Sequence, residues 1–526
     1  MKNGLITTIL LAAALCACSS KEYLSWNRPV KGEEGFSHDM IVLGEQLSDP
    51  YSVENMSRAL QAVDPLAAGR GTLDATDFYV RFLPRDESEL QMLLDKGLLL
   101  IDHPLDYRII REGDWYHDPD LPEGVITWQY AVVPVDFEFP RGVRYERIDD
   151  CFIADHAPGT RSDGIDWDAV EREAFRLSGN AGMLPPATKG DSLSHTPRGR
   201  IAIMDPDFSN EPVGVKGVRV CCNSFVKIAT AYTDEDGNYR MSKSFAGKVR
   251  YRLLFQNSKG FCQGVNLVLV PASTSALGQQ PSEGYSITLD SSSDSKMFAR
   301  CVVNNAGYDY LEACSSDGLP AFPKELRVWN LQLLDVNFSP MLHQGVLLET
   351  YEDLKSMLGN YAPLVKILWP DVLLGLSGAS GYAEIYARAL HAFAHAGHFS
   401  LAGKEWWNDY VLFCLNALAS SSFRSMYGSE DDEGSAYCDL AESYAFYCQN
   451  VLYRRHYPET SEFFGTGSWF SPQLFMHMEE RGLVLDKIAP LMTSNVTDME
   501  VMKNKLLSYY PEYKSVITEA FVRYDK

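Results

Sequence analysis

The sequence has no cluster of basic residues and, after its first residues, no long apolar run. Its 47 Lys and Arg are outnumbered by 70 Asp and Glu, which gives a formal net charge of −23. Nucleic-acid binding depends on clustered Lys and Arg that neutralise phosphates, so a nucleic acid is excluded as an expected partner. After Cys18 no stretch approaches the roughly 18 unbroken apolar residues of a membrane-spanning helix, and none is expected there.

Several catalytic motifs are also missing, and the cysteines follow no regular pattern. The sequence has no serine nucleophile elbow, Walker loop or dinucleotide-binding fingerprint. Nine cysteines follow Cys18, and an odd, irregularly spaced set in a large chain does not indicate a disulfide framework. We expect isolated buried thiols, with a bridge from Cys414 to Cys438 left open.

The N-terminus has the profile of an export signal. Lys2 is followed by an apolar run over residues 5–15, and the chain turns polar directly after Cys18. The run is too short to cross a bilayer, and the small residues before Cys18 resemble the lipobox of bacterial lipoproteins. The resemblance implies removal of a signal peptide, residues 1–17, and a lipid on Cys18.

The lipid predicted on Cys18 implies a place for the protein. Two or three acyl chains give a lasting anchor, since each buried methylene contributes about 0.8 kcal/mol. The serine after Cys18 resembles outer-membrane sorting in Gram-negative bacteria. We therefore expect a chain tethered to the membrane through Cys18, at the outer membrane or the cell surface.

The remaining chain, with 46% hydrophobic and 22% charged residues, has a globular composition, and its length suggests two to four domains. Residues 18–191 mix short apolar runs with Asp, Pro and aromatic residues, which predicts an α+β region with a helix near residues 87–96. The Pro and Gly of residues 184–190 indicate a linker.

Residues 197–300 show alternating polarity with an Asp-Gly turn, which predicts a β-sandwich. The order of strands and the turn over residues 233–239 resemble the carboxypeptidase regulatory-like domain, a transthyretin-like sandwich. Asp234 and Asp236 lack the rest of a calcium-binding loop, so an ordinary turn is expected there.

Helical spacing dominates residues 301–526. We expect helices near residues 350–358, 382–396, 404–419, 437–453 and 498–507. The predicted fold class is multidomain α+β, with an N-terminal α+β region, a central transthyretin-like sandwich and a mainly helical, metallopeptidase-like C-terminal domain.

Three of the 11 histidines fall within eight positions, at His391, His395 and His398. The alanine-rich segment around them favours a helix, and at about 100° per residue the first two lie about 40° apart on one face. Both imidazoles can then reach one ion. His398 would share this face only if the helix continued past Gly397, which glycine makes doubtful.

The i, i+4 spacing is that of the zincin helix, in which two histidines hold zinc and a Glu after the first is the general base. Here Ala392 stands in that position. A third ligand must come from elsewhere, and our candidate is Glu442 in a predicted amphipathic helix. Asp439, one turn earlier, is expected to orient one of the histidines.

The run over 391–399, the segment Trp406–Tyr410 and the run Ala441–Ala445 together resemble a family of gluzincin-type zinc-metallopeptidase lipoproteins. The resemblance implies zinc ligands at His391, His395 and Glu442. The general base of that family has no counterpart in this sequence.

Three functions stay open. The first is a lipoprotein whose degenerate metallopeptidase-like domain binds a peptide or protein with little or no hydrolysis. The second is an active zinc metallopeptidase with another general base; Glu384 lies about 10 Å along the helix from His391 and is poorly placed for this role. The third is a scaffold or glycan-binding lipoprotein in which the histidines are structural.

Overall fold

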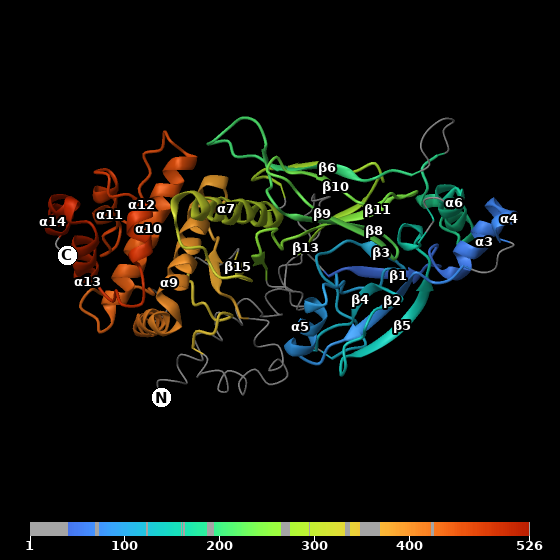
Figure 1. Ribbon diagram of the computed structural model, residues 1–526, viewed down its shortest axis with the longest axis horizontal. Coiled ribbons are helices and arrows are strands. Elements are labelled where there is room, and N and C mark those ends of the chain that lie inside the picture. Colours follow the sequence, from blue (N-terminus) through green and yellow to red (C-terminus); the bar gives the residue numbers. More distant parts are fainter. Residues whose placement is uncertain are drawn as a thin grey trace.

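The computed structural model describes residues 40–68, 73–122, 125–158, 160, 164–186, 194–264, 274–293, 295–331, 337–347, 369–421, 425–524 and 526. The helical C-terminal region forms one end of the molecule, and the N-terminal α+β region lies beside the central β-sheets at the other end (Figure 1). The predicted multidomain α+β fold is confirmed. The signal peptide and Cys18 lie outside the described residues.

The N-terminal region is built on an antiparallel sheet with strand order β4 (Gln129–Pro134), β2 (Asp77–Leu83), β5 (Arg144–Cys151). The predicted helix forms as α5 (Glu87–Asp95), and Leu90 and Leu93 pack on Val80 and Phe82 of the sheet. Three further pairs of elements complete the region: β1 (Val42–Gln46) with β3 (Tyr107–Arg111), α3 (Val53–Val63) with α6 (Trp167–Leu177), and α4 (Pro65–Ala68) with α3. Residues 184–186 of the expected linker follow a short turn of helix, and the rest lies outside the described residues.

Two sheets form the central region (Figure 1). One has the order β13 (Thr274–Gln280), β11 (Val249–Leu254), β8 (Arg219–Ser224), β9 (Lys227–Tyr232); the other has β10 (Asn238–Arg240), β6 (Arg198–Ile203), β14 (Ile287–Leu289), with β7 (Val213–Gly214) beside β6. Alternate residues of both sheets share one core, as the period of two predicts. The expected turn is confirmed, because Asp234 Oδ1 accepts the backbone N–H of Asp236 and Asn238 at 3.1 and 2.7 Å.

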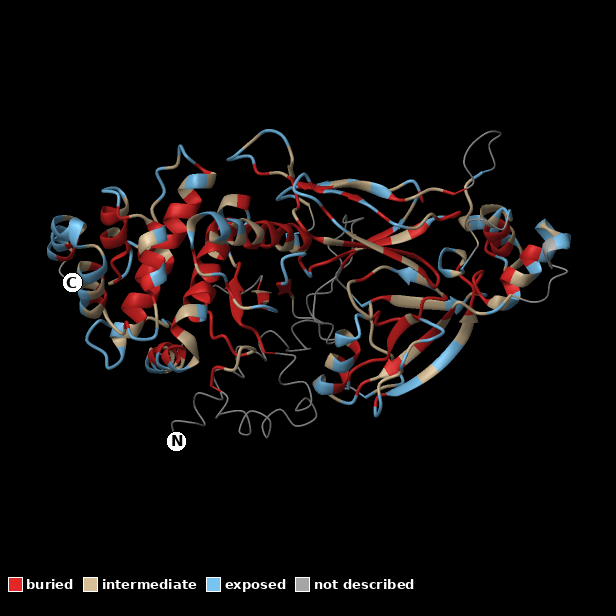
Figure 2. Ribbon diagram, viewed as in Figure 1, coloured by how far each residue is buried: buried red, intermediate tan, exposed pale blue. Residues whose placement is uncertain are grey.

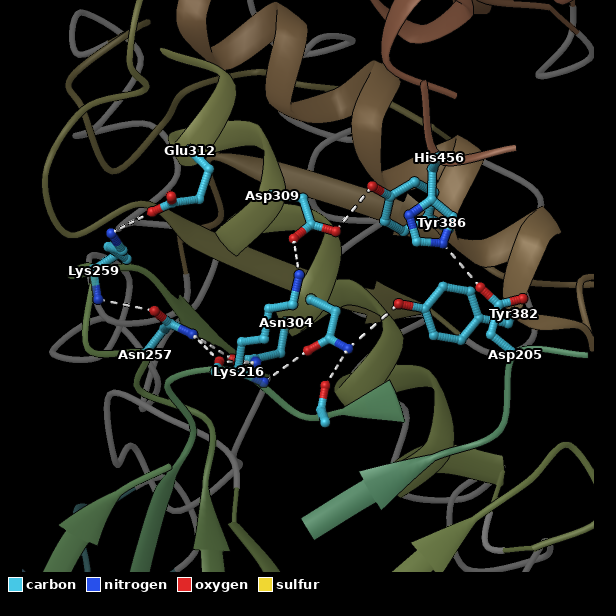
Figure 3. A network of polar contacts seen from close by, with 12 residues as sticks. Asp205, Lys216, Asn257, Lys259, Asn304, Asp309, Glu312, Tyr382, Tyr386 and His456 are labelled. Carbon is cyan, nitrogen blue, oxygen red and sulfur yellow. Dashed lines mark hydrogen bonds and ion pairs between the residues drawn. The ribbon is translucent and has the colours of Figure 1, made fainter. Parts of the chain in front are cut away.

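A buried helix that the sequence did not reveal, α7 (Ser295–Asp317), joins the central and helical regions. Asn304 and Asn305 are buried in it and donate to the backbone oxygens of Lys216 and Gly214 at 2.7 and 2.9 Å. Asp309 pairs with Lys216 and accepts from the hydroxyl of Tyr386, as Figure 3 shows. A parallel sheet of β12 (Cys262–Gln263), β15 (Arg327–Leu331) and β16 (Val372–Gly375) makes a second link.

The helical region is organised around two long helices, α9 (Tyr382–Ser420) and α10 (Ser435–His456), which are buried along most of their length (Figure 2). Around them lie α11 (Pro472–Glu479), α12 (Leu485–Ile488), α13 (Met499–Tyr509) and α14 (Lys514–Arg523). The helices expected near residues 437–453 and 498–507 are confirmed, and the one near 350–358 lies outside the described residues.

The two helices predicted over 382–396 and 404–419 both form within α9, on either side of a non-helical break at Gly403 (φ 81°, ψ 172°). Gly397 does not end the helix. A Cβ there would lie 2.2 Å from the Tyr310 hydroxyl and 2.5 Å from the Pro320 oxygen, so glycine permits the close approach of α7. The doubt about a helix past Gly397 was wrong because this glycine serves packing.

The nine cysteines after Cys18 are free thiols in the structure, and all except the half-buried Cys314 are buried. This confirms isolated buried thiols and leaves Cys414 and Cys438 unbridged. Among the described residues, no helix combines the length and the apolar character needed to span a membrane.

Candidate metal centre

Helices α9 and α10 run antiparallel, since early residues of α9 meet late residues of α10: Tyr382 packs on His456 and His391 on Phe446. On their facing sides α9 presents His391 and His395, one turn apart, and α10 presents Glu442. All three residues are buried: His391 is 7% exposed, His395 3% and Glu442 1%. The sequence therefore predicted correctly which residues come together.

The ligand-capable atoms of this group lie close to one another. The Nε2 atoms of His391 and His395 are 3.0 Å apart. Glu442 Oε2 lies 3.2 Å from His391 Nε2, and Glu442 Oε1 lies 3.3 Å from His395 Nε2. One ligand atom from each residue can be chosen so that all lie within 4.8 Å of one another.

These separations match those of metal ligands. Zinc bonds of about 2.0 to 2.1 Å in a tetrahedral arrangement put neighbouring ligand atoms about 3.3 Å apart. The group can therefore hold a metal ion with little movement of the side chains. In the described part of the chain, it is the only cluster of three or more His, Cys, Asp or Glu side chains with this capacity.

The charge states also suit metal binding. Burial raises the pKa of the Glu442 carboxyl, but the adjacent His395 and His391 outweigh this effect and hold the pKa well below its usual value. Burial lowers the pKa of His391. An ionised carboxylate and a neutral imidazole are the forms that bind a metal ion.

Two further residues support the group, and the sequence analysis gave neither a role. Tyr410 of α9 donates its hydroxyl to Glu442 Oε1 at 2.7 Å and so orients the carboxylate. Gln449, seven residues after Glu442 on α10, lies near enough to the His391 ring to raise its pKa slightly against the larger effect of burial. The seven-residue spacing puts Gln449 on the face of Glu442, which is the one sequence signal that pointed to it.

Asp439 lies one turn before Glu442, as predicted, but its contacts lead elsewhere. It accepts from the Ser443 hydroxyl at 3.1 Å and pairs with Lys526 Nζ at 2.9 Å. Its expected role in orienting a histidine stays a prediction, and Gln449 has the better position for that role.

His398 is helical and fully buried, yet it stands apart from the three ligands. Its ring packs against Trp406, Trp407 and Tyr444. Neither ring nitrogen has a hydrogen-bond partner among the described residues, and burial lowers the pKa of His398 to about 3. This histidine is part of the core.

No carboxylate replaces the missing general base at the expected position. Ala392 is buried with 3% exposure and has no proton acceptor. Glu384 is held at the start of α9, where its Oε2 accepts the backbone N–H of Ser380 at 2.9 Å and of Gly381 at 3.4 Å. Its carboxylate is thus committed to capping the helix.

A cleft of about 930 Å³ opens beside the group. Its wall includes His391, Phe446 and Gln449, whereas His395 and Glu442 lie behind. A metal ion held by the three side chains would thus be reached from the cleft past His391. Three protein ligands with access from a cleft are typical of zinc sites that bind a further ligand.

Comparisons with protein-family models, with curated proteins and with solved structures found no match for this chain.

Proposed function

We propose that the helical region binds one zinc ion through His391, His395 and Glu442, and that the adjoining cleft binds a peptide or protein with little or no hydrolysis. The observation that carries the proposal is the convergence of the Nε2 and Oε atoms at 3.0 to 3.3 Å in a buried site beside a cleft.

The donor set favours zinc over the common hard cations. Two imidazole nitrogens and one carboxylate are typical zinc ligands, whereas calcium and magnesium prefer oxygen. The ring Nδ1 atoms of His391 and His395 lack hydrogen-bond partners among the described residues. The short contacts of both rings within the group are made through Nε2, which is therefore the nitrogen on the metal side.

Bound zinc would supply a Lewis acid that polarises a carbonyl oxygen of the ligand. Among the chain's own residues, Tyr410 fixes the carboxylate of Glu442. A zincin also needs a carboxylate that takes up and returns a proton, and such assistance contributes roughly 10²- to 10⁴-fold. Ala392 cannot do this, which supports binding with slow hydrolysis.

An active peptidase with another general base is the second candidate. A third is a scaffold or glycan-binding lipoprotein in which the histidines are structural. The third is favoured by one observation, since Glu442 can accept hydrogen bonds from Nε2 of both histidines without a metal.

Metal analysis together with a peptide-cleavage assay separates these functions. We expect about one zinc per chain, its loss in His391→Ala, and little cleavage. Cleavage at rates typical of enzymes, about 1 to 10³ per second, would establish the second candidate. A zinc-free protein whose function survives His391→Ala would establish the third.

We also propose that the chain is an outer-membrane or surface lipoprotein tethered through Cys18. Because lipidation requires the Cys18 thiol, Cys18→Ser should leave the chain uncleaved or without lipid. Fatty-acid labelling and membrane fractionation test this expectation. Normal labelling and retention of the variant would refute the anchor.

A further inference from the structure

The cleft beside the metal group carries an excess of negative charge around Tyr453. Its wall includes four exposed carboxylates, Asp207, Glu384, Glu459 and Glu462, here called the acidic end. They come from three separate segments: the loop after β6, the first turn of α9 and the chain after α10. Within the described part of the chain, none of the four forms an ion pair.

Few positive charges compensate these carboxylates. Arg388 is the one Arg among the described cleft residues, and none is Lys. Its guanidinium donates to the backbone oxygen of Gly375 at 2.7 Å and is held at the end of β16. His456 donates toward the buried carboxylate of Asp205 at 2.9 Å, as Figure 3 shows. Among the described residues, no ion pair therefore neutralises the acidic end, although Glu384 also accepts backbone N–H groups at the start of α9.

The acidic end surrounds aromatic side chains. Tyr453 lies in the cleft wall, and its pKa is raised by burial and by the negative charges of Glu462, Asp207, Asp205 and Glu384. Phe208, Phe446 and Phe464 line the same cleft. Aromatic rings attract cations and cover the alkyl stem of a long basic side chain.

A second observation also points to a ligand. Gln449, one turn before Tyr453 on α10, lies in the cleft wall with 3% exposure. Its Oε1 has no hydrogen-bond partner among the described residues. A buried acceptor without a partner is costly, and an N–H group of a bound ligand would satisfy it.

The acidic end is not arranged for a metal ion. In the described part of the chain, His391, His395 and Glu442 are the only group close enough together for one. Carboxylates too far apart to share a metal ion suit a larger cation, such as a guanidinium or an ammonium on a flexible stem.

We infer that the cleft selects peptides with a basic residue, whose charged side chain lies at the acidic end against Tyr453. The inference rests on the proposed peptide-binding function and names its ligand class. Glu384 is seven residues, about 10 Å of helix, before His391. An extended peptide spans about 3.3 to 3.6 Å per residue, so the basic residue lies within about three residues of the peptide group next to His391.

The test uses three octapeptide libraries with Arg, citrulline or Glu fixed at position four and uncharged residues elsewhere. Citrulline keeps the shape of arginine without its charge. Binding is measured with the zinc-loaded full chain at low salt. We expect the Arg library to bind about tenfold more tightly than the citrulline library, and the Glu library most weakly. The preference should shrink at 0.3 M salt because screening shortens the range of the interaction.

A double variant, Asp207→Asn with Glu462→Gln, should reduce the Arg preference to less than about threefold. The matched control, Asp431→Asn with Glu433→Gln, removes the same charge from an exposed turn outside the cleft wall. This control should keep the preference for the Arg library. Equal binding of the Arg and citrulline libraries, no saturable binding of the Arg library, or a preference that survives the double variant would overturn the inference.

The same titrations on zinc-free protein separate this inference from the proposed function. If a chain that binds no zinc still prefers the Arg library, the acidic end is supported as the binding site of the basic side chain, and the metal centre is refuted. A chain that binds zinc but shows no preference would refute the acidic end alone.

Discussion

The Tyr410 hydroxyl lies 2.7 Å from Oε1 of Glu442, and both residues are buried between α9 and α10. This hydrogen bond connects the second half of α9, beyond the bend at Gly403, to the carboxylate that faces the two histidines. The carboxylate is thereby oriented before any ion arrives, and such supporting contacts usually strengthen metal affinity.

Tyr410→Phe removes this hydrogen bond and leaves the ring. We expect zinc affinity to fall roughly 10- to 100-fold, because the carboxylate loses the group that orients it. A competition titration with a zinc chelator measures the change. Tyr447→Phe is the matched control, since it removes a hydrogen bond from a buried Tyr of α10 to Glu479 of α11. Equal affinities for wild type and Tyr410→Phe would show that this contact does not support the site.

His398→Gln tests the buried histidine outside the site. Burial lowers the pKa of His398 to about 3, whereas in the unfolded chain it is about 6.5. The unfolded state therefore binds more protons between these values, and stability present above pH 6.5 is lost as the pH falls toward 3. The contribution to the slope is at most about 1.4 kcal/mol per pH unit.

Urea unfolding of the metal-free chain at pH 7.0, 5.5 and 4.5 measures this effect. As the pH is lowered, the free energy of unfolding should decrease less steeply in His398→Gln than in the wild type. Parallel curves would mean that His398 can take up a proton in the folded state.

Gly397→Ala tests the contact between α9 and α7. The added Cβ would lie within 2.5 Å of the Tyr310 hydroxyl and the Pro320 oxygen, so the helices must separate. We expect a loss of about 1 to 3 kcal/mol in the free energy of unfolding. Gly467→Ala, where an added Cβ meets nothing within 4 Å, should change stability by less than about 0.5 kcal/mol. Similar stability of the two variants would contradict the close packing at Gly397.

Ala392→Glu tests why hydrolysis is expected to be slow. A carboxylate directly after His391 restores the residue that a zincin uses to move the proton. Peptide cleavage should then rise by about 10²- to 10⁴-fold, whereas Ala392→Gln, which adds similar volume without a base, should leave it unchanged. If Ala392→Glu binds zinc but cleaves no faster, the cleft no longer supports catalysis, and binding alone remains.

The ligands could be predicted from the sequence because they depend on local periodicity. The spacing of His391 and His395 fixes a shared helix face, and the predicted amphipathic helix, supported by the resemblance, indicated Glu442. Other features depend on contacts between distant segments and have no local signal. Examples are the contact of Asp439 with Lys526 and the hydrogen bond from Tyr410 to Glu442.

Helix α7 shows the same limit. Its Asn304 and Asn305 resemble loop residues in the sequence, and only the backbone oxygens of the central sheets make their burial favourable. Likewise, tertiary neighbours decide that Gly397 continues α9, whereas the break at Gly403 falls between the two helices that the sequence predicts. The cleft could not be foreseen because its wall comes from segments more than 200 residues apart, such as Asp207 and Glu462.

A crystal structure of the zinc-loaded chain, with anomalous data on both sides of the zinc edge, tests the central claim most directly. We predict one anomalous peak between α9 and α10, about 2.0 to 2.2 Å from Nε2 of His391, Nε2 of His395 and a carboxylate oxygen of Glu442. A peak elsewhere, or no peak while these three side chains keep their contacts with one another, would contradict the metal centre.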